Sequence, residues 1–291
     1  MALRGTEPQM LHLYYQSAPE VASLCHAAAD PTSRRVEKRD IIPGLYYGGL
    51  KVWSCAPYLA AYLLQHAHTP LAQLLGCGGP AGTQTGNDAG AAMTWQQYLR
   101  QEGVAVAELG CGQALPALAA LALGARRLLL QDYNAEVLTL CTQPNVGHTY
   151  QELLRQRPAA CRPLHVQLLS GDWADLARLA DNHAPSPSPS QPRPLRCPVI
   201  LGSDVTFDET ACEKLVRLLA QWLQPPPDQR WPPAVALIAT KEYYFGTNGG
   251  VVELCRCAAA HGLEAAVLHR EGGGSPTTPR GRSTRMTPIR G

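Results

Sequence analysis

Three aspartates occupy positions at which a sheet of parallel strands would bring their side chains together. Asp132, Asp172 and Asp204 each follow a short apolar run. The carboxyl ends of parallel strands lie along one edge of a sheet, and ligands bind beyond that edge. Trp173 follows Asp172, and a carboxylate beside an aromatic ring can hydrogen-bond an adenine amino group and cover the base. The pattern favours a nucleoside that has a positive centre and no phosphate.

A glycine cluster after the first strand candidate favours the same kind of ligand. Gly110 and Gly112 let the backbone turn sharply and approach a ligand closely. The cluster is not the dinucleotide fingerprint, because Leu115 stands where that motif has its third glycine. Asp132 lies 20 residues beyond Gly112, the spacing of a carboxylate that binds a ribose diol, and Glu108 favours a cationic group. S-adenosylmethionine meets these requirements.

Each of these acids also has a purely structural interpretation. Asp132 and Asp172 could each cap the helix that follows. Ser203 and Asp204 could be turn formers. We favour the ligand site, because the acids recur in order at successive strand ends.

The runs between these residues alternate between the periods of strands and helices. Strand candidates are short and apolar or alternating, and helix candidates repeat apolar residues every three to four positions. The strand candidates are residues 104–109, 127–131, 164–169, 198–202, 234–240 and 263–268, and the helical stripes are 115–122, 211–222 and 251–258. The alternation predicts an α/β fold in which helices cover both faces of a parallel sheet.

The composition narrows the class of protein. The chain has 291 residues, of which 45% are hydrophobic, and a formal net charge of +2, so a general binder of nucleic acid or membrane surfaces is not expected. No apolar run reaches the ~18 residues of a membrane span, and the first residues lack an apolar signal-peptide core. The ten cysteines include no C-x-x-C pair, so we expect reduced thiols and no metal.

Segments of biased composition divide the chain. We expect an N-terminal extension at residues 1–37 and one folded domain at 38–268, with loop insertions at 76–92 and 184–194. Residues 269–291 are rich in glycine, proline and arginine, and we expect a disordered basic tail. The tail could contact RNA, but a solvated tail is the simpler interpretation.

Five motifs within residues 38–268 occur together in one known family. They are residues 43–53 (PGLYYGGLKVW), 131–134 (QDYN), 144–146 (PNV), 170–173 (SGDW) and 244–250 (YFGTNGG). In these motifs the chain resembles the class I, seven-β-strand methyltransferases, and more narrowly the histidine protein methyltransferases of the METTL18 group. The resemblance implies a Rossmann-like, seven-stranded sandwich and S-adenosylmethionine as the cofactor.

The resemblance also implies which residues form the site. The implied cofactor-binding residues are Trp53, Ser54, Cys55, Ala56, Pro57, Glu108, Gly110, Gly112, Gln131, Asp132, Tyr133, Asn134, Gly171, Asp172, Trp173 and Ser203. Within this set Glu108 would face the ammonium group and Asp132 would hold the ribose. Asp172 and Trp173 would hold the adenine. For Trp53 a plain core aromatic is the alternative interpretation.

Methyl transfer to an imidazole needs alignment rather than a strong base. A neutral imidazole, with a pKa near 6.5, already has a lone pair on one ring nitrogen. We expect Asp204 to bind the other nitrogen and to stabilise the imidazolium, and Tyr244 to act beside it. The expected substrate-binding residues are Tyr243, Phe245, Asn248 and Gly249. Hydrophobic packing is the alternative role for Tyr244 and Phe245.

The chain departs from its relatives in two places. Relatives have Ser-Glu-Thr where this chain has Ser203-Asp204-Val205, which keeps the carboxylate but shortens its side chain. Relatives also finish with two antiparallel strands, whereas this chain continues after Leu268 into a Gly/Pro/Arg-rich stretch. We therefore expect the C-terminal strand hairpin to be incomplete, with an exposed sheet edge.

The resemblance implies a protein substrate, the large-subunit ribosomal protein uL3, and a monomeric enzyme of the cytoplasm and nucleus. DNA and membranes are not expected as partners. A lysine-directed methyltransferase of the same family is one alternative. A pseudoenzyme that binds S-adenosylmethionine and serves as a binding partner is another, suggested by the altered C-terminus. A nicotinamide-dependent oxidoreductase would need the glycine that is absent at Leu115.

Overall fold

The computed structural model describes residues 46–74, 93–158, 162–180, 197–223, 234–270 and 284–290. The expected extension at 1–37 and the insertions at 76–92 and 184–194 lie outside the described residues. Among the described helices, none has the length and apolar character needed to span a membrane.

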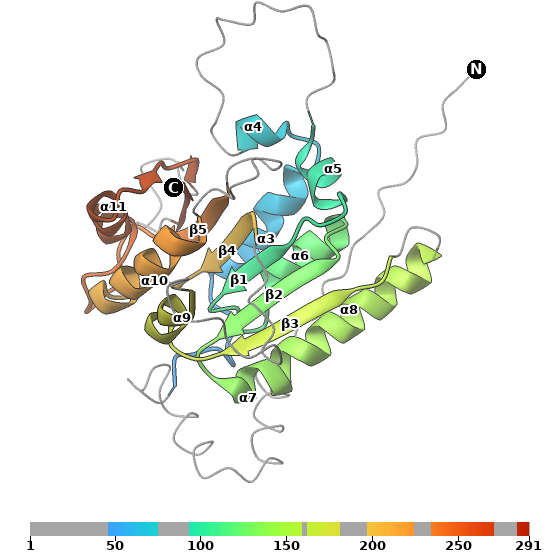
Figure 1. The fold of residues 1–291 in the computed structure, drawn as a ribbon, viewed down its shortest axis with the longest axis horizontal. Helices are drawn as coiled ribbons and strands as arrows, with labels where there is room; N and C mark the ends of the chain where they lie inside the picture. The colour runs from blue at the N-terminus through green and yellow to red at the C-terminus, as the bar shows by residue number, and fades with distance from the viewer. Residues whose placement is uncertain are drawn as a thin grey trace, which may run out of the picture.

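One twisted sheet forms the centre of the fold (Figure 1). Its strands are β1 (Val106–Leu109), β2 (Arg127–Asp132), β3 (His165–Ser170), β4 (Val199–Ser203), β5 (Val235–Lys241), β6 (Glu264–Ala265), β7 (His269–Arg270) and β8 (Thr284–Arg290). The order is β3-β2-β1-β4-β5-β8-β6, and β7 also pairs with β8. The first five strands in this order are parallel. The order reverses between β1 and β4, so the switch point of the sheet lies there.

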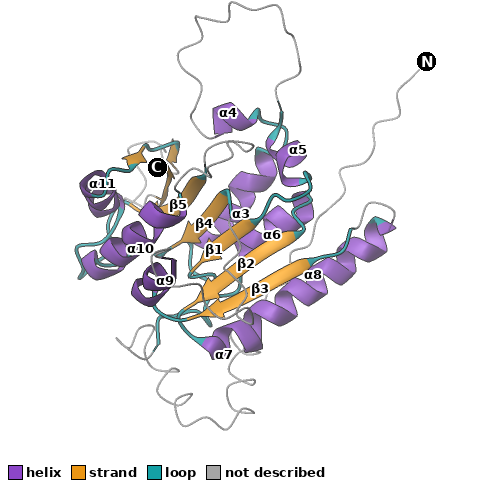
Figure 2. Ribbon diagram, viewed as in Figure 1, coloured by secondary structure: helices purple, strands orange, loops and turns teal. Residues whose placement is uncertain are grey.

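Helices cover both faces of the sheet, as Figure 2 shows. They are α3 (Cys55–Gln65), α4 (Leu71–Leu74), α5 (Trp95–Leu99), α6 (Leu115–Leu123), α7 (Ala135–Val137), the π-helical turn η1 (Leu138–Thr142), α8 (Gln143–Gln156), α9 (Trp173–Ala180), α10 (Glu209–Trp222) and α11 (Val251–Ala260). Buried residues of α3, α5, α6 and α8 pack on one face, and those of α9, α10 and α11 pack on the other. The predicted Rossmann-like α/β fold is therefore confirmed.

The alternation of side chains along the strands explains why both faces are covered. In β2, Leu128 and Leu130 belong to the core beneath α3 and α6, whereas Leu129 belongs to the core beneath α9 and α10. Successive side chains of a strand point to opposite faces, so Leu128, Leu129 and Leu130 make both faces of β2 apolar. A strand that is apolar on both faces is stable only between two layers of helices.

The C-terminal segment differs from the prediction. Residues 284–290 form β8, which pairs antiparallel with β5 from Val235↔Arg290 to Lys241↔Thr284. The expectations of an incomplete hairpin and of a disordered tail over these residues are therefore wrong. The physical reason lies in β5, which is buried along its whole length and needs a partner on its outer edge. Ile289 of β8 is fully buried in the core of that region.

Candidate active site

A cavity of about 490 Å³ lies beyond the carboxyl ends of the parallel strands, around the switch point between β1 and β4. Most of the residues that were predicted from sequence line this cavity. They are Trp53, Ala56, Gly110, Gly112, Gln131, Asp132, Tyr133, Gly171, Asp172, Trp173, Ser203, Asp204, Tyr243, Tyr244 and Phe245. Among the described residues no cluster of His, Cys, Asp and Glu has the arrangement of a metal site. Glycine backbone, carboxylates, aromatic rings and lysines line the cavity.

Asp132 fixes the glycine loop that follows β1. Its Oδ2 accepts a hydrogen bond from the backbone N–H of Gly112 at 2.9 Å, and its Oδ1 accepts one from Asn134 N–H at 3.1 Å. Burial raises the pKa of Asp132 to about 6, although these hydrogen bonds favour its charged form. The backbone N–H of Tyr133 is a third donor to this carboxylate, so about one of its four acceptor sites remains for a hydroxyl group of a ligand.

The segment from Tyr46 to Trp53 packs directly on the glycine loop. Gly112 has a φ of +49°, and a Cβ on it would lie 3.0 Å from the carbonyl oxygen of Gly49. A Cβ on Gly49 would lie 2.9 Å from Oδ2 of Asp132. The two glycines are needed at this contact because neither position has room for a side chain.

The PNV motif and Thr142, the last residue of η1, also support the loop. The hydroxyl of Thr142 donates to the carbonyl oxygen of Gly112 at 2.6 Å, and Asn145 Nδ2 donates to the carbonyl oxygen of Gln113 at 3.1 Å. Gln113 in turn donates to the carbonyl oxygen of Leu50 at 3.0 Å. Pro144 lacks a backbone N–H, which is consistent with the wider π-helical turn η1 just before it. This motif therefore positions the loop rather than lining the cavity.

Gln131 joins the ends of three strands. Its Oε1 accepts hydrogen bonds from Gly110 N–H at 3.1 Å and from Trp173 Nε1 at 2.7 Å. Its Nε2 donates to the carbonyl oxygen of Gly171 at 2.9 Å. The side-chain amide thus holds the three predicted contact residues in place.

Asp172 has the structural role that was the alternative to ligand binding. Its Oδ1 accepts a hydrogen bond from Ala174 N–H at 2.8 Å at the start of α9. Its Oδ2 lies 2.5 Å from Nζ of Lys214, which comes from α10 and also lines the cavity. Asp172 raises the pKa of Lys214 through this hydrogen bond. The sequence argument did not single out Lys214, because a lysine on an amphipathic helix has no distinctive local signal.

Asp204 is the most constrained carboxylate in the cavity. It adopts a φ of +56°, and a left-handed conformation costs a non-glycine residue about 1 kcal/mol. Its Oδ2 accepts a hydrogen bond from Cys55 N–H at 2.8 Å, at the beginning of α3. Its Oδ1 accepts one from the hydroxyl of Tyr244 at 2.9 Å and lies 3.3 Å from Nζ of Lys241. Strained backbone that persists at such a position is typical of functional sites.

Lys241 is a second residue that the sequence argument missed. It is the last residue of β5, and its buried Nζ lies 5.6 Å from the ring centroid of Trp53 and 4.9 Å from that of Tyr244. The rule that selected the three aspartates, a polar residue at a strand end, also selects this lysine.

Burial and Asp204 raise the pKa of Tyr244 well above its usual value, so its hydroxyl stays protonated.

Several predicted residues do not line the cavity. These residues are Ser54, Cys55, Pro57, Glu108, Asn134, Asn248 and Gly249. Glu108 is fully buried, and its Oε2 accepts a hydrogen bond from Ala117 N–H in the first turn of α6 at 2.8 Å. It therefore contacts α6 instead of facing a ligand in the cavity. The backbone N–H of Cys55 binds Asp204.

The mouth of the cavity has exposed aromatic side chains. Tyr243 is 56% exposed and Phe245 is 73% exposed, and their rings meet edge to face with centroids 5.1 Å apart. Asn248 donates instead to Glu209 Oε1 at 2.8 Å. A Cβ on Gly249 would clash with the backbone of Thr206 and Phe207. The aromatic pair is thus available to a ligand, whereas Asn248 and Gly249 hold the loop.

The fold and the cavity define a Rossmann-like α/β protein with a site at the switch point of its sheet. The chain is similar to proteins named histidine protein methyltransferase 1 homolog. The protein from Dictyostelium discoideum is 26% identical over 216 residues, 74% of this chain and 50% of that protein. The protein from Rattus norvegicus is 28% identical over 229 residues, 73% of this chain and 49% of that protein. The resemblance indicated by the sequence motifs is confirmed.

This similarity extends over only part of the relatives. The chain spans about half the length of the curated relatives it matches. No protein-family model matches the chain. Among solved structures, a precorrin-6y C5,15-methyltransferase from Geobacter metallireducens has a TM-score of 0.39 and 12% identity, over 67% of this chain and 84% of that one.

Proposed function

We propose that this chain is an S-adenosylmethionine-dependent protein-histidine N-methyltransferase. The observation that carries the proposal is a single cavity that contains a glycine loop tied to Asp132 and, beside it, the buried carboxylate of Asp204 with fixed partners. The similarity to histidine protein methyltransferases supports the assignment.

The described residues fit S-adenosylmethionine. Gly110 and Gly112 have positive φ angles and expose backbone to the cavity, so a ligand can approach closely. Asp132 retains about one acceptor site for a ribose hydroxyl. Trp173 lines the cavity and offers an aromatic surface to adenine, with its indole oriented by Gln131. When bound, the cofactor supplies an electrophilic methyl group on a cationic sulfur.

Asp204 orients the imidazole in this proposal. A carboxylate has about four acceptor sites, and Cys55 N–H, the Tyr244 hydroxyl and the Lys241 ammonium use three of them. The remaining site accepts the N–H of an imidazole. That hydrogen bond selects the tautomer whose lone pair is on the other ring nitrogen, and the carboxylate stabilises the positive charge that appears on the ring.

The same arrangement disfavours lysine as the substrate. A lysine ammonium must lose a proton before it can act as a nucleophile. Tyr244 keeps its own proton, because its pKa is raised, so its hydroxyl cannot act as the base that a lysine substrate would need. A neutral imidazole needs no such base.

We extend the proposal to a protein substrate and its location. The exposed pair Tyr243 and Phe245 suits the side chains of a polypeptide that approaches the mouth. The family resemblance suggests ribosomal protein uL3 as that polypeptide, with the enzyme acting as a monomer in the cytoplasm and nucleus. The pairing of β8 with β5 removes the argument for a binding-only pseudoenzyme that a missing strand would have made.

Incubation of the purified chain with radiolabelled S-adenosylmethionine and uL3, followed by amino-acid analysis, tests the proposal. We expect methylhistidine as the product. Asp132→Ala should abolish binding of S-adenosylhomocysteine in calorimetry, whereas Asp204→Asn should keep binding and lower turnover about a hundredfold or more. Methyllysine as the product would contradict the histidine assignment. Binding of S-adenosylhomocysteine without turnover would favour the pseudoenzyme.

A further inference from the structure

Lys241 brings a positive charge into the candidate active site, directly beside the carboxylate that the proposed function assigns to the imidazole. Its Nζ lies 3.3 Å from Oδ1 of Asp204, and the two side chains are only 8% and 3% exposed. Both residues line the cavity. Burying either charge alone would cost free energy, and here the two opposite charges compensate each other.

The pairing of β4 with β5 explains why these two side chains meet. Ser203 pairs with Ala239, and the backbone N–H of Asp204 donates to the carbonyl oxygen of Ala239 at 3.0 Å. Strand β5 continues for two residues after Ala239 and ends at Lys241. Lys241 therefore reaches past the end of β4, where Asp204 lies.

Two aromatic rings lie close to the same ammonium group. Nζ of Lys241 lies 5.6 Å from the ring centroid of Trp53 and 4.9 Å from that of Tyr244. Aromatic faces attract cations within about 6 Å of the ring centroid. Nζ of Lys51 lies 5.1 Å from the centroid of Trp53 as a second ammonium group. We call the side chains of Asp204, Trp53 and Tyr244 the cation subsite, and the chain's own Lys241 occupies it.

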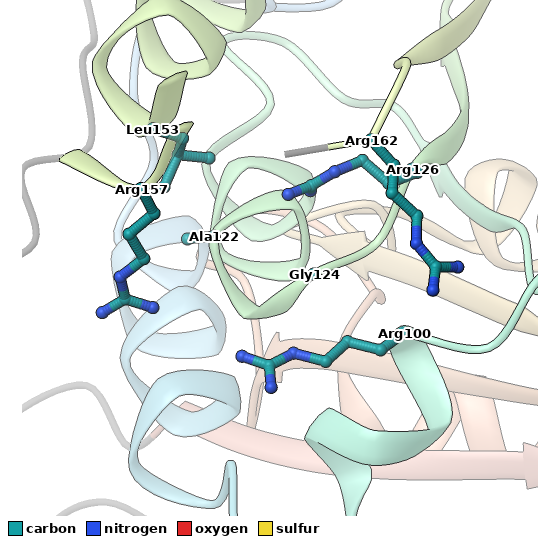
Figure 3. Close-up of a pocket in the computed structure, with 7 residues that line it drawn as sticks. All are labelled: Arg100, Ala122, Gly124, Arg126, Leu153, Arg157 and Arg162. Atoms are coloured by element: carbon teal, nitrogen blue, oxygen red, sulfur yellow. The ribbon is translucent and has the colours of Figure 1, made fainter. Parts of the chain in front are cut away.

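A second cavity, of about 200 Å³, also has several cations, but it lies elsewhere in the fold. Figure 3 shows its arginines around the end of α6. Arg126 lines that cavity and directly precedes β2, whereas Asp132 ends β2 and lines the candidate active site. The six residues of β2 span roughly 20 Å at about 3.3 Å per residue, and charges that far apart act on each other only weakly. The positive charge beside Asp204 therefore comes from Lys241.

We propose that Lys241 is a specificity-determining residue, which occupies the cation subsite and so restricts the reaction to an uncharged nucleophile such as imidazole. A substrate ammonium could reach Asp204 only by approaching an ammonium group that is already there, and like charges at close range in a shielded site repel strongly. A neutral imidazole N–H can use the acceptor site that remains on Asp204 without this repulsion. The inference rests on the proposed function and names the residue that distinguishes histidine from lysine.

Ligand-observed NMR titration of the full chain with two probes tests the proposal without requiring turnover. At about pH 8.5, 4-methylimidazole presents the neutral ring of histidine, and n-butylammonium presents the charged end of lysine. We expect the unchanged chain to bind n-butylammonium roughly tenfold or more weakly than 4-methylimidazole. Lys241→Met removes the charge and should bind n-butylammonium roughly tenfold or more tightly than the unchanged chain does. Lys241→Arg keeps the charge and should keep the exclusion.

The matched control is Arg256→Met, which removes one positive charge from an exposed residue of α11 that pairs with Glu253. It should bind both probes as the unchanged chain does. Urea unfolding shows whether each variant is folded, and Lys241→Gln replaces Lys241→Met if the latter is not.

The outcomes separate this proposal from the proposed function. A lysine with a purely structural role would give no gain of n-butylammonium binding when its charge is removed. That result, an equal gain in the control, or equal binding of both probes by the unchanged chain overturns the proposal. A gain for n-butylammonium without any binding of 4-methylimidazole supports the role of Lys241 and counts against the proposed function alone.

Discussion

The buried carboxyl of Glu108 makes the stability of this protein depend on pH. Burial raises its pKa from 4.5 to about 8, against the hydrogen bond from Ala117 and with a further contribution from the charge of Asp132. In the unfolded chain the group titrates near its ordinary value. Between the two values the folded state binds a proton that the unfolded state has lost. The free energy of unfolding therefore falls as pH rises through this window.

The magnitude follows from the width of the window. Each pKa unit corresponds to about 1.4 kcal/mol, so a shift from 4.5 to about 8 removes about 5 kcal/mol in total. Roughly 4 kcal/mol of this loss falls between pH 5 and pH 8. Glu108→Gln has no titrating group, and its amide oxygen can still accept the hydrogen bond from Ala117.

Urea unfolding of both proteins at pH 5, 6, 7 and 8 measures the effect. The free energy of unfolding of Glu108→Gln, minus that of the unchanged chain, should increase by about 1.4 kcal/mol per pH unit across this range. The control is Glu102→Gln, which removes one carboxyl group at an exposed position and should change the free energy of unfolding by no more than about 0.5 kcal/mol. A pH-independent difference for Glu108→Gln would refute the reasoning, because it would mean that the group titrates alike in both states.

Three other changes test the framework of the site. Gly249→Ala should destabilise the fold by about 1–3 kcal/mol in thermal unfolding, since its Cβ would meet backbone, whereas Gly147→Ala in α8 has open space and should be neutral or stabilising. Lys241→Met leaves the Asp204 carboxylate buried without its cation and should cost roughly 3 kcal/mol in urea unfolding; adding Asp204→Asn should recover part of the loss. Thr142→Val removes the hydroxyl that holds the glycine loop and should weaken S-adenosylhomocysteine binding about fivefold in calorimetry; unchanged affinity would contradict this role.

The sequence located the edge of the sheet at which the site lies, because the position of a residue after an apolar strand is a local property. Asp132, Asp172 and Asp204 all line the cavity for this reason. The same rule also selects Lys241, which the argument overlooked while it considered only acids. The partner of each side chain is not local. Asp172 pairs with a lysine of α10, 42 residues away, and no spacing rule encodes that contact.

The two clearest departures have the same physical origin. Glu108 precedes the glycine loop and suggested a ligand contact, but the pleat of β1 turns its side chain toward α6. Residues 284–290 have the composition of a disordered tail, yet they form β8 along the open edge of β5. In both cases the outcome is decided by a neighbour that is distant in sequence.

The segment from Tyr46 to Cys55 lies outside the sheet, yet it contacts both halves of the site. Tyr47 N–H donates to Asn134 Oδ1 at 3.3 Å, and Gly49 packs on Asp132, so the segment contacts the end of β2. Cys55 N–H binds Asp204 after β4, so the same segment contacts the other half of the sheet. One short stretch thus positions both the carboxylate assigned to the cofactor and the carboxylate assigned to the imidazole. Cofactor binding and turnover should therefore respond separately to changes at the two carboxylates, but together to a change at Gly49, which lies between Tyr47 and Cys55 in this segment.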